Sequence, residues 1–438
     1  MISLADWGIW IIYLGVITII LWFLRDRKQP ELAKFYLPGF YVKVFGGVAF
    51  VVIYIYHYKG VGDTFLYFNG AKVLANAMVE SPVDYFRLIL SSSNNLPPDL
   101  YRYTQDIFYA HTAEEWFMVK LLSPIVLLSF KSYLVTTLLV SVFSFFGAWK
   151  LFKVFNHALK SYPYLAFGVA FLIPSTVFFG GGVIKDTVTM VGISVVIYAL
   201  YFGLRERMNL KLMLIALFWA FIILNLKAYI ILSFLPSFFI IVYIFFRSRS
   251  QNKMLRLMIT PMLIAFIAAV AYLSFQNLPD ISEKYNQNNL EKKLKGFHTW
   301  HATIGESAYS LGEIEYTPLG VMKKVPAALM TTFFKPYVWK ARNPVVLLSA
   351  LESLFIFILF FLVTIKTRFK YFKYLPSGFF RALVSFVLLF GFIVGFTSYN
   401  FGALARYKIP VIPVFVFILI LILLQVREKE KEAKIKPN

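Results

Sequence analysis

The 438-residue sequence contains no cysteine, and charged residues make up only 15% of it. Without cysteine the chain can form no disulfide, no thiolate nucleophile and no cysteine-ligated zinc site. A soluble domain carries about 25% charged residues, so this chain has too little polar surface to enclose a water-soluble globule. Hydrophobic residues reach 59%, and lipid must therefore solvate much of the surface.

Acidic residues are also scarce, with 22 Asp and Glu against 44 Lys and Arg, which gives a formal net charge of +22. The basic residues stand in short runs between apolar segments. This spacing is the positive-inside pattern of membrane proteins and not a nucleic-acid-binding patch. The same cations attract anionic headgroups, so we expect membrane lipids, and no nucleic acid, among the partners.

Apolar runs of about 20 residues, the length of a membrane span, recur along the chain. They predict an all-α, polytopic transmembrane helix bundle with about eleven spans. The predicted spans are 7–24, 41–58, 123–147, 163–181, 186–203, 211–226, 228–246, 256–275, 344–365, 381–398 and 409–425. The segment 211–246 is interpreted as a tight hairpin; the alternative, one long kinked helix, would invert the topology downstream.

The orientation follows from the distribution of Lys and Arg among the connectors. One set holds three or more basic residues each: 25–34, 150–160, 204–211, 247–256, 366–381 and the tail from 426. The short connectors of the other set, around 183–187, 225–228 and 399–408, hold one or two. The basic set is expected in the cytoplasm, which places the N-terminus outside, the C-terminus inside and the protein in the cell inner membrane.

Residues 1–425 are expected to form a single transmembrane domain, followed by a charged cytoplasmic tail at 426–438. Two long segments, about 59–122 and 276–343, are predicted as outer-face loops. Short amphipathic stretches within them, such as Val83–Leu90 and Pro318–Phe334, are typical of interfacial helices.

Asp63 follows a predicted span on the outer side, within the sequence Lys59-Gly60-Val61-Gly62-Asp63-Thr64. A partly desolvated carboxylate there suits general-base work, and the glycines let backbone approach a substrate closely. The structural alternative is that Asp63 caps the helix that follows.

Lys185 and Asp186 follow three glycines at the outer start of the next span. Glycines before a helix N-terminus make a phosphate cradle plausible, although adjacent opposite charges could also neutralise each other. Lys227 lies at the tip of the predicted hairpin, where it could bind a phosphate or simply reach the interface as a snorkelling lysine.

Two further outer segments carry candidate substrate-binding residues. Lys335 and Trp339 close the second loop, where aromatics beside a cation suit sugar stacking next to a phosphate, or a plain interface anchor. Asn400, Arg406 and Tyr407 precede the last span; the arginine could hold a diphosphate bidentately or only set helix depth. The predicted topology brings all these outer charges to one membrane face, as a site for an anionic, membrane-borne substrate.

Other chemistry has weak sequence support. His298 and His301, spaced i and i+3 near Glu306, are poor evidence for a metal site. No nucleotide-binding loop, dinucleotide fingerprint or nucleophile elbow occurs in the sequence. The sequence firmly implies no cofactor, and it leaves room for a divalent metal.

Two short motifs carry a family resemblance. Gly62-Asp63-Thr64 stands in the first large outer segment, and Arg406-Tyr407-Lys408-Ile409-Pro410 precedes a late span. In this layout the chain resembles the GT-C superfamily of polyprenyl-phosphate-dependent membrane glycosyltransferases and related surface-polysaccharide enzymes. Two spans precede Asp63, one more than that family usually has.

The resemblance implies sugar transfer at the outer leaflet from a polyprenyl-phosphate-linked sugar to a lipid, glycan or protein acceptor. It implies that Asp63 deprotonates the acceptor hydroxyl and that Lys227, Lys335 and Arg406 hold the leaving phosphate. Three alternatives remain: an O-antigen-type polymerase or ligase, a transporter or flippase of lipid-linked substrates, and a non-enzymatic assembly protein. A transporter predicts ionisable residues inside spans. The span interiors are interpreted as nearly free of charge, and the doubtful cases are Lys131 and Glu352.

Overall fold

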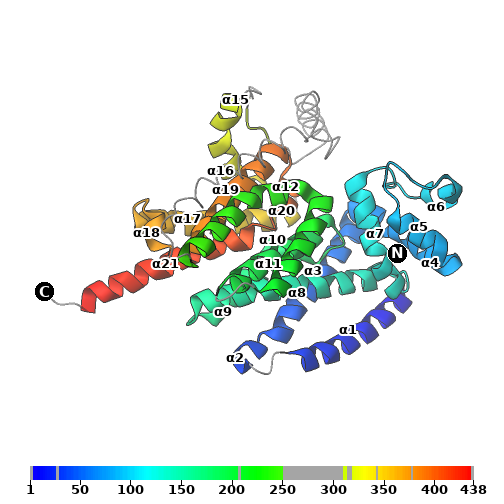
Figure 1. The fold of residues 1–438 in the computed structure, drawn as a ribbon, viewed down its shortest axis with the longest axis horizontal. Helices are drawn as coiled ribbons and strands as arrows, with labels where there is room; N and C mark the ends of the chain where they lie inside the picture. Colours follow the sequence, from blue (N-terminus) through cyan, green and yellow to red (C-terminus); the bar gives the residue numbers. More distant parts are fainter. Residues whose placement is uncertain are drawn as a thin grey trace. The chain divides into compact units, whose positions relative to one another are not determined.

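A computed structural model describes residues 3–25, 29–205, 209–249, 309–312, 318–341, 344–375 and 378–435. The described residues are helical and form no named β-strand (Figure 1). They divide into two compact units. The first unit comprises residues 1–199 and 209–228, and the second comprises 200–208 and 229–438. The prediction of an all-α fold is confirmed.

Seven helices of the described residues are long and apolar enough to cross a membrane, and two bent helix pairs raise the number to nine. Their outward faces carry large apolar side chains, such as Ile12 (66% exposed) and Phe355 (57% exposed), which suits lipid and not water. The sequence predicts about eleven spans. The difference has two sources. The predicted span 256–275 lies outside the described residues, and the two predicted spans within 211–246 are counted as one, although the helix is interrupted at Lys227.

The helices of the first unit are, in chain order, α1 (Leu4–Leu24), α2 (Pro30–Ala33), α3 (Tyr36–Val52), the π-helix η1 (Ile53–His57), α4 (Asp63–Glu80), α5 (Pro82–Leu90), the short η2 (Pro98–Leu100), α6 (Tyr101–Thr104), α7 (Ala113–Leu128), α8 (Tyr133–Leu159), α9 (Pro163–Phe171), α10 (Pro174–Phe178), η3 (Phe179–Gly181) and α11 (Lys185–Gly203). The last residues of α11 belong to the second unit. Helix α3 packs on α8, which α1 flanks (Figure 1). The pair α9 and α10–η3 is bent by 62°.

The predicted outer loop 59–122 is mostly helical and packs into an apolar core that it shares with Val140, Val183 and Ile222. Helices α4 and α7 pack along each other, and their contact buries Tyr67, Leu74 and Trp116. The amphipathic stretch Val83–Leu90 is α5, which turns Leu88 into this core. Alternation of buried and exposed side chains over α4 and α7 stabilises these helices by tertiary packing, so the segment is a folded layer and not a loop with a few short helices.

The predicted span 123–147 is wrong in its boundaries. A turn at 129–132 separates α7 from α8, because Phe130 and Lys131 adopt left-handed backbone conformations (φ 51° and 61°) that a helix cannot contain. The hydroxyls of Ser129 and Thr136 bond to each other across the turn, at 2.6 Å. Lys131 therefore lies in a turn, half-buried, and not inside a span.

Helix α12 (Leu210–Arg249) is interrupted at Lys227, whose backbone is extended (φ −156°, ψ 80°). The interruption falls at the tip of the predicted hairpin. An unbroken helix of 40 residues would measure about 60 Å, roughly twice the hydrocarbon thickness of a bilayer. The last residue of the first unit, Ala228, directly follows Lys227, so the interruption also marks the division between the units.

The second unit contains α15 (Pro318–Lys323), α16 (Val325–Phe334), η5 (Val338–Lys340), α17 (Pro344–Thr367), α18 (Tyr371–Tyr374), α19 (Gly378–Thr397), α20 (Phe401–Tyr407) and α21 (Ile412–Ile435). The predicted amphipathic stretch Pro318–Phe334 corresponds to α15 and α16. Helix α19 packs on α16 and α21. Gly395 lets α16 and α19 approach closely, because a side chain at this position would overlap the carbonyl of Ala328 and the hydroxyl of Thr332. Helix α21 extends past the predicted span, with exposed side chains from Arg427 to Ala433.

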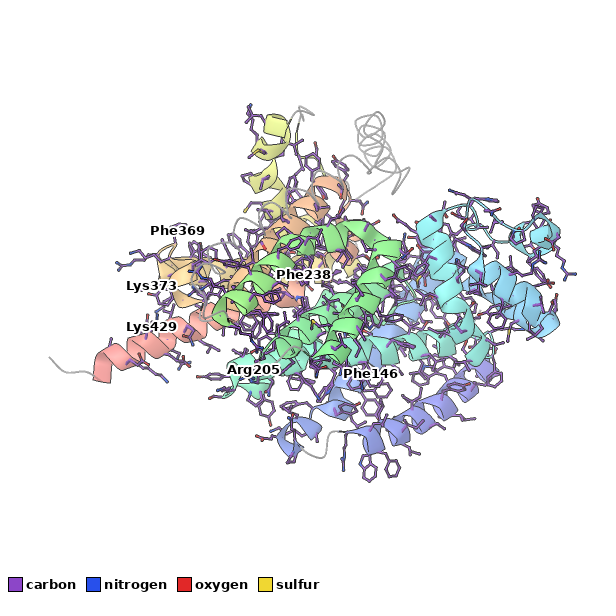
Figure 2. The ribbon with its side chains drawn as sticks, viewed as in Figure 1. Phe146, Arg205, Phe238, Phe369, Lys373 and Lys429 are labelled. Carbon is purple, nitrogen blue, oxygen red and sulfur yellow. The ribbon has the colours of Figure 1, made fainter. Side chains whose placement is uncertain are left out.

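Residues of the basic connectors make contacts within each unit. In the first unit the Lys34 amine donates to the Tyr164 hydroxyl, near the start of α9, at 3.2 Å. In the second unit Lys429 of α21 reaches the carbonyl of Lys373 at 3.5 Å (Figure 2 labels both lysines). Both amines lie over the Tyr374 ring.

Candidate functional site

Asp63 begins α4, directly after a turn that contains two glycines with positive φ. At Gly62 the value is 139°, a conformation that residues with a side chain rarely adopt. The carboxylate is half-buried and accepts a hydrogen bond from the Tyr109 hydroxyl at 3.1 Å. The capping residue of α4 is Gly62 and not Asp63, and Tyr109, which lies in the segment between α6 and α7, helps to hold the carboxylate.

Lys185 joins α11 to α7 through two carboxylates. Its amine lies 2.8 Å from Glu115 and 3.2 Å from Glu114, and all three side chains are largely buried. Both glutamates lie in the first turn of α7, where the helix dipole also favours negative charge. The cation predicted to meet a substrate phosphate is thus charge-balanced within the protein.

Asp186 and Lys227 form a second buried ion pair between α11 and the interruption in α12. Asp186 is 1% exposed and Lys227 is 7% exposed. The hydroxyl of Thr187 next to them lies within hydrogen-bonding distance of the carbonyl oxygens of Phe179 and Gly182, at 2.8 and 2.7 Å, and its single proton can go to either. The turn before this helix start therefore presents carbonyl oxygens to it, which disfavours an anion cradle at this position.

These charged residues form one group, which we call the ion-pair cluster: Glu114, Glu115, Lys185, Asp186 and Lys227. Val183 and Leu226, which flank it in sequence, are buried in the same apolar core as Tyr67 of α4, so the cluster lies against the helical layer of α4 and α7. The structure brings together three of the predicted residues and adds two glutamates. The adjacent acids Glu114-Glu115 before an apolar run are the sequence signal that would have revealed them.

Lys43, inside the candidate span Pro30–His57, is fully buried. Its amine donates to the carbonyl of Thr176 at 2.9 Å, in the second half of the bent pair α9 and α10–η3. The prediction that span interiors are nearly free of charge missed this lysine. A single Lys among apolar residues is a visible signal, since such a residue is costly in a bilayer and marks a structural or functional site.

The predicted residues of the second unit fall on two elements. Lys335 and Trp339 lie in the turn from α16 to α17, where the Lys335 amine stands 5.9 Å from the centre of the Tyr337 ring. The rings of Tyr337 and Trp339 stack, with centroids 4.9 Å apart and planes at 16°. Trp339 is 79% exposed. We call residues 335–340 the cationic turn.

Asn400, Arg406 and Tyr407 belong to α20, which forms a 70° bend with α21. The Asn400 side chain caps α20 by accepting from the amides of Gly402 and Ala403, at 2.8 and 3.2 Å. The Arg406 guanidinium lies 5.0 Å from the centre of the Tyr407 ring and 3.3 Å from its hydroxyl. The geometry gives Asn400 a structural task.

A buried polar chain that sequence reasoning missed links these two elements. Lys408, two residues after Arg406, lies 3.6 Å from Glu352 and donates to the Ser353 hydroxyl at 3.1 Å. Ser353 in turn donates to the carbonyl of Lys335 at 2.9 Å. Glu352 lies within an apolar run and Lys408 directly precedes one, which is the sequence signal for this pair.

Within the described residues, no group of three His, Asp or Glu side chains is arranged to hold a metal ion. His298, His301 and Glu306 lie outside those residues, as does most of the predicted loop 276–343. The predicted substrate contacts of Lys185, Asp186, Lys227, Lys335, Trp339, Arg406 and Tyr407 remain predictions. The internal partners of Lys185 and Lys227 leave Lys335 as a stronger candidate for an anionic ligand.

Comparison with known proteins gives no relative. No protein-family model matches the chain, and neither curated proteins nor solved structures include a significant match.

Proposed function

We propose that the chain is an integral-membrane glycosyltransferase that moves a sugar from a polyprenyl-phosphate-linked donor to a lipid, glycan or protein acceptor at the outer face of the inner membrane. The observation that carries the proposal is the Asp63 carboxylate, half-buried after a glycine turn and held by Tyr109 at 3.1 Å. A carboxylate in such a position can accept a proton from a hydroxyl.

In the proposed reaction Asp63 takes the proton of the acceptor hydroxyl. The acceptor oxygen attacks the anomeric carbon of the donor sugar, and the bond from that carbon to the phosphate oxygen breaks. The electron pair leaves with the phosphate, whose negative charge basic side chains neutralise. The ion-pair cluster has internal partners and serves in this proposal to hold the helix ends around the outer layer. No cofactor is required, and a divalent metal could assist the leaving phosphate.

Transfer by the purified protein tests the proposal. Radiolabelled polyprenyl-phosphate and polyprenyl-diphosphate sugars serve as donors in detergent, and Asp63→Asn is compared with wild type. Loss of a general base lowers the rate by about 10²–10⁴-fold. Asp106→Asn is the matched control because Asp106 is an exposed carboxylate of the same outer layer. Absence of transfer from every donor, or full activity of Asp63→Asn, contradicts the proposal.

An O-antigen-type polymerase or ligase is the closest alternative, and it relies on outer arginines instead of a carboxylate. Transfer that survives Asp63→Asn but is lost in Arg406→Ala would favour it.

A lipid-linked substrate transporter is the second candidate because Lys43 is buried inside a span. Ionisable residues in spans are typical of transport pathways. Translocation of a labelled lipid across vesicles by wild type, and its loss in Lys43→Met, would favour this function over transfer.

A further inference from the structure

The side chain of Ser353 holds the backbone of the cationic turn through a hydrogen bond. This serine is fully buried on α17, and its hydroxyl donates to the carbonyl of Lys335 at 2.9 Å. A hydroxyl carries one donor and two acceptor positions. Its donor position goes to the turn, and an acceptor position receives the amine of Lys408 at 3.1 Å. The direction of both hydrogen bonds is therefore determined.

Lys408 is in turn held by Glu352. Both side chains are buried, at 0% and 2% exposure, with 3.6 Å between amine and carboxylate. A buried ion pair contributes little net stability because both charges lose their hydration. A hydrophobic pair of the same volume would fill the space between α17 and the α20–α21 bend at least as well. One path from these charges runs through Ser353 to the turn, which points to a task besides stability.

The turn itself gathers positive charge. Burial, and then the neighbouring Lys340, lower the pKa of Lys335, so the two cations repel each other. Among the described residues, no carboxylate forms an ion pair with either lysine. An anion placed at the turn would relieve this repulsion. Beside the amines, the stacked Tyr337 and Trp339 rings offer an exposed apolar face of the kind that packs against a sugar.

We propose that Ser353, Lys408 and Glu352 are positioning residues that hold the cationic turn as a subsite for the phosphate and first sugar of a lipid-linked substrate. The ligand class rests on the proposed function, whereas the positioning rests only on the hydrogen bonds and burial described above. Lys335 and Lys340 would contact the phosphate, and Trp339 the sugar. A surface that merely anchors the protein in the interface would need no buried chain behind it.

A spin label tests the positioning without any ligand. Because the chain has no cysteine, Ala341→Cys creates a single labelling site directly after the turn. We expect a slow-motion spectrum in the labelled protein and a clearly more mobile one after Ser353→Ala. Ser349→Ala is the matched control, since Ser349 lies one turn earlier on α17 and its buried hydroxyl has no hydrogen bond among the described residues. Ser353→Thr keeps the hydroxyl and should keep the slow spectrum. Equal spectra for Ser353→Ala and Ser349→Ala overturn the proposal.

Binding of farnesyl phosphate tests the subsite. Full-length protein in phosphatidylcholine nanodiscs is titrated with this lipid, and tryptophan fluorescence is followed with Trp339→Phe as reference. We expect Ser353→Ala to weaken binding about tenfold, equivalent to one modest hydrogen bond, and Ser349→Ala to leave it unchanged. Equal binding by Ser353→Ala overturns the subsite assignment while the proposed function stands. No binding by wild type overturns both the assignment and the proposed function, and leaves the positioning to the spin label.

The same titration with phosphatidylglycerol separates two sources of phosphate. Weaker binding of phosphatidylglycerol than of farnesyl phosphate supports a subsite for the lipid-linked substrate. Equal binding would make the turn a general anionic-headgroup contact and overturn the assignment.

Discussion

The ion-pair cluster of the first unit and the cationic turn of the second unit use the same residue types for different ends. In the cluster, Lys185 lies between two glutamates and Lys227 pairs with Asp186. In the turn, Lys335 has an aromatic ring and another lysine nearby. Glu352, a carboxylate near that turn, forms an ion pair with the buried Lys408.

The comparison teaches that a lysine at a helix end is not by itself a ligand site. A cation that already touches two carboxylates gains little from a phosphate, because the internal partners must be displaced first. A cation among rings and like charges gains more from the same phosphate. The first arrangement holds helices together, and the second is available to a ligand.

Removal of Asp186 would test the structural side of this contrast most strongly. Asp186→Asn removes the carboxylate that pairs with buried Lys227, and such a change costs about 3–5 kcal/mol. Thermal unfolding in detergent, followed by tryptophan fluorescence, should show a large fall in Tm. Asp186→Asn combined with Lys227→Met should recover part of it, and Asp106→Asn should have no effect. An unchanged Tm in Asp186→Asn would mean that the cluster does not hold the unit.

The second unit should depend more on close backbone packing than on ion pairs. Gly395→Ala places a methyl group against Ala328 and Thr332 of α16, and such overpacking costs about 1–3 kcal/mol. Gly168→Ala is the control, because a methyl group there meets open space and Ala favours the helix. If both variants unfold at the wild-type temperature, α16 and α19 do not need this approach.

Exchange of Lys335 for glutamine would test the ligand side. We expect Lys335→Gln to bind farnesyl phosphate about tenfold less tightly, since about 1.4 kcal/mol is lost, while Tm stays near the wild-type value. Lys185→Gln should show the opposite pattern, because it leaves Glu114 and Glu115 facing each other without their cation. A reversed result, with Lys185 controlling binding, would break the comparison.

The smallest expected effect is a pH dependence of binding through Lys335. Its pKa is lowered by burial and then by Lys340, so its proton is lost at lower pH than that of a free lysine, whose pKa is about 10.4. Binding of farnesyl phosphate should therefore weaken as pH rises through this lowered value. Lys335→Gln should lack that dependence, and titrations at several pH values compare the two proteins.

Much of the fold could be predicted from the sequence. Apolar runs define most long helices, and α5, α15 and α16 fall where amphipathic stretches predict them. Two features could not be predicted. The left-handed turn at Phe130 and Lys131 lies inside a predicted span whose one charged residue is Lys131. The helical layer α4–α7 depends on contacts between distant residues such as Tyr67 and Trp116.

The candidate site was predictable as a set of positions but not as a set of partners. Asp63, Lys185 and Lys335 could be selected because charged residues beside spans are rare and costly. The partners of Asp63 and Lys185 lie 46 and 71 residues away in the first unit, and no local pattern reveals such pairing. Lys43 and Glu352 lie within apolar runs, and Lys408 directly precedes one, so the sequence alone marks all three as unusual.

The interruption at Lys227 has a consequence for the order of synthesis. Every member of the ion-pair cluster, and Asp63 with Tyr109, lies within the first 228 residues, where the first unit ends. A chain that emerges from the N-terminus, and whose domains fold in that order, can therefore neutralise the buried charges of the first unit as soon as Lys227 has been made. In the second unit the ion pair between Glu352 and Lys408 can form only much later, when Lys408 has been synthesised near the end of translation.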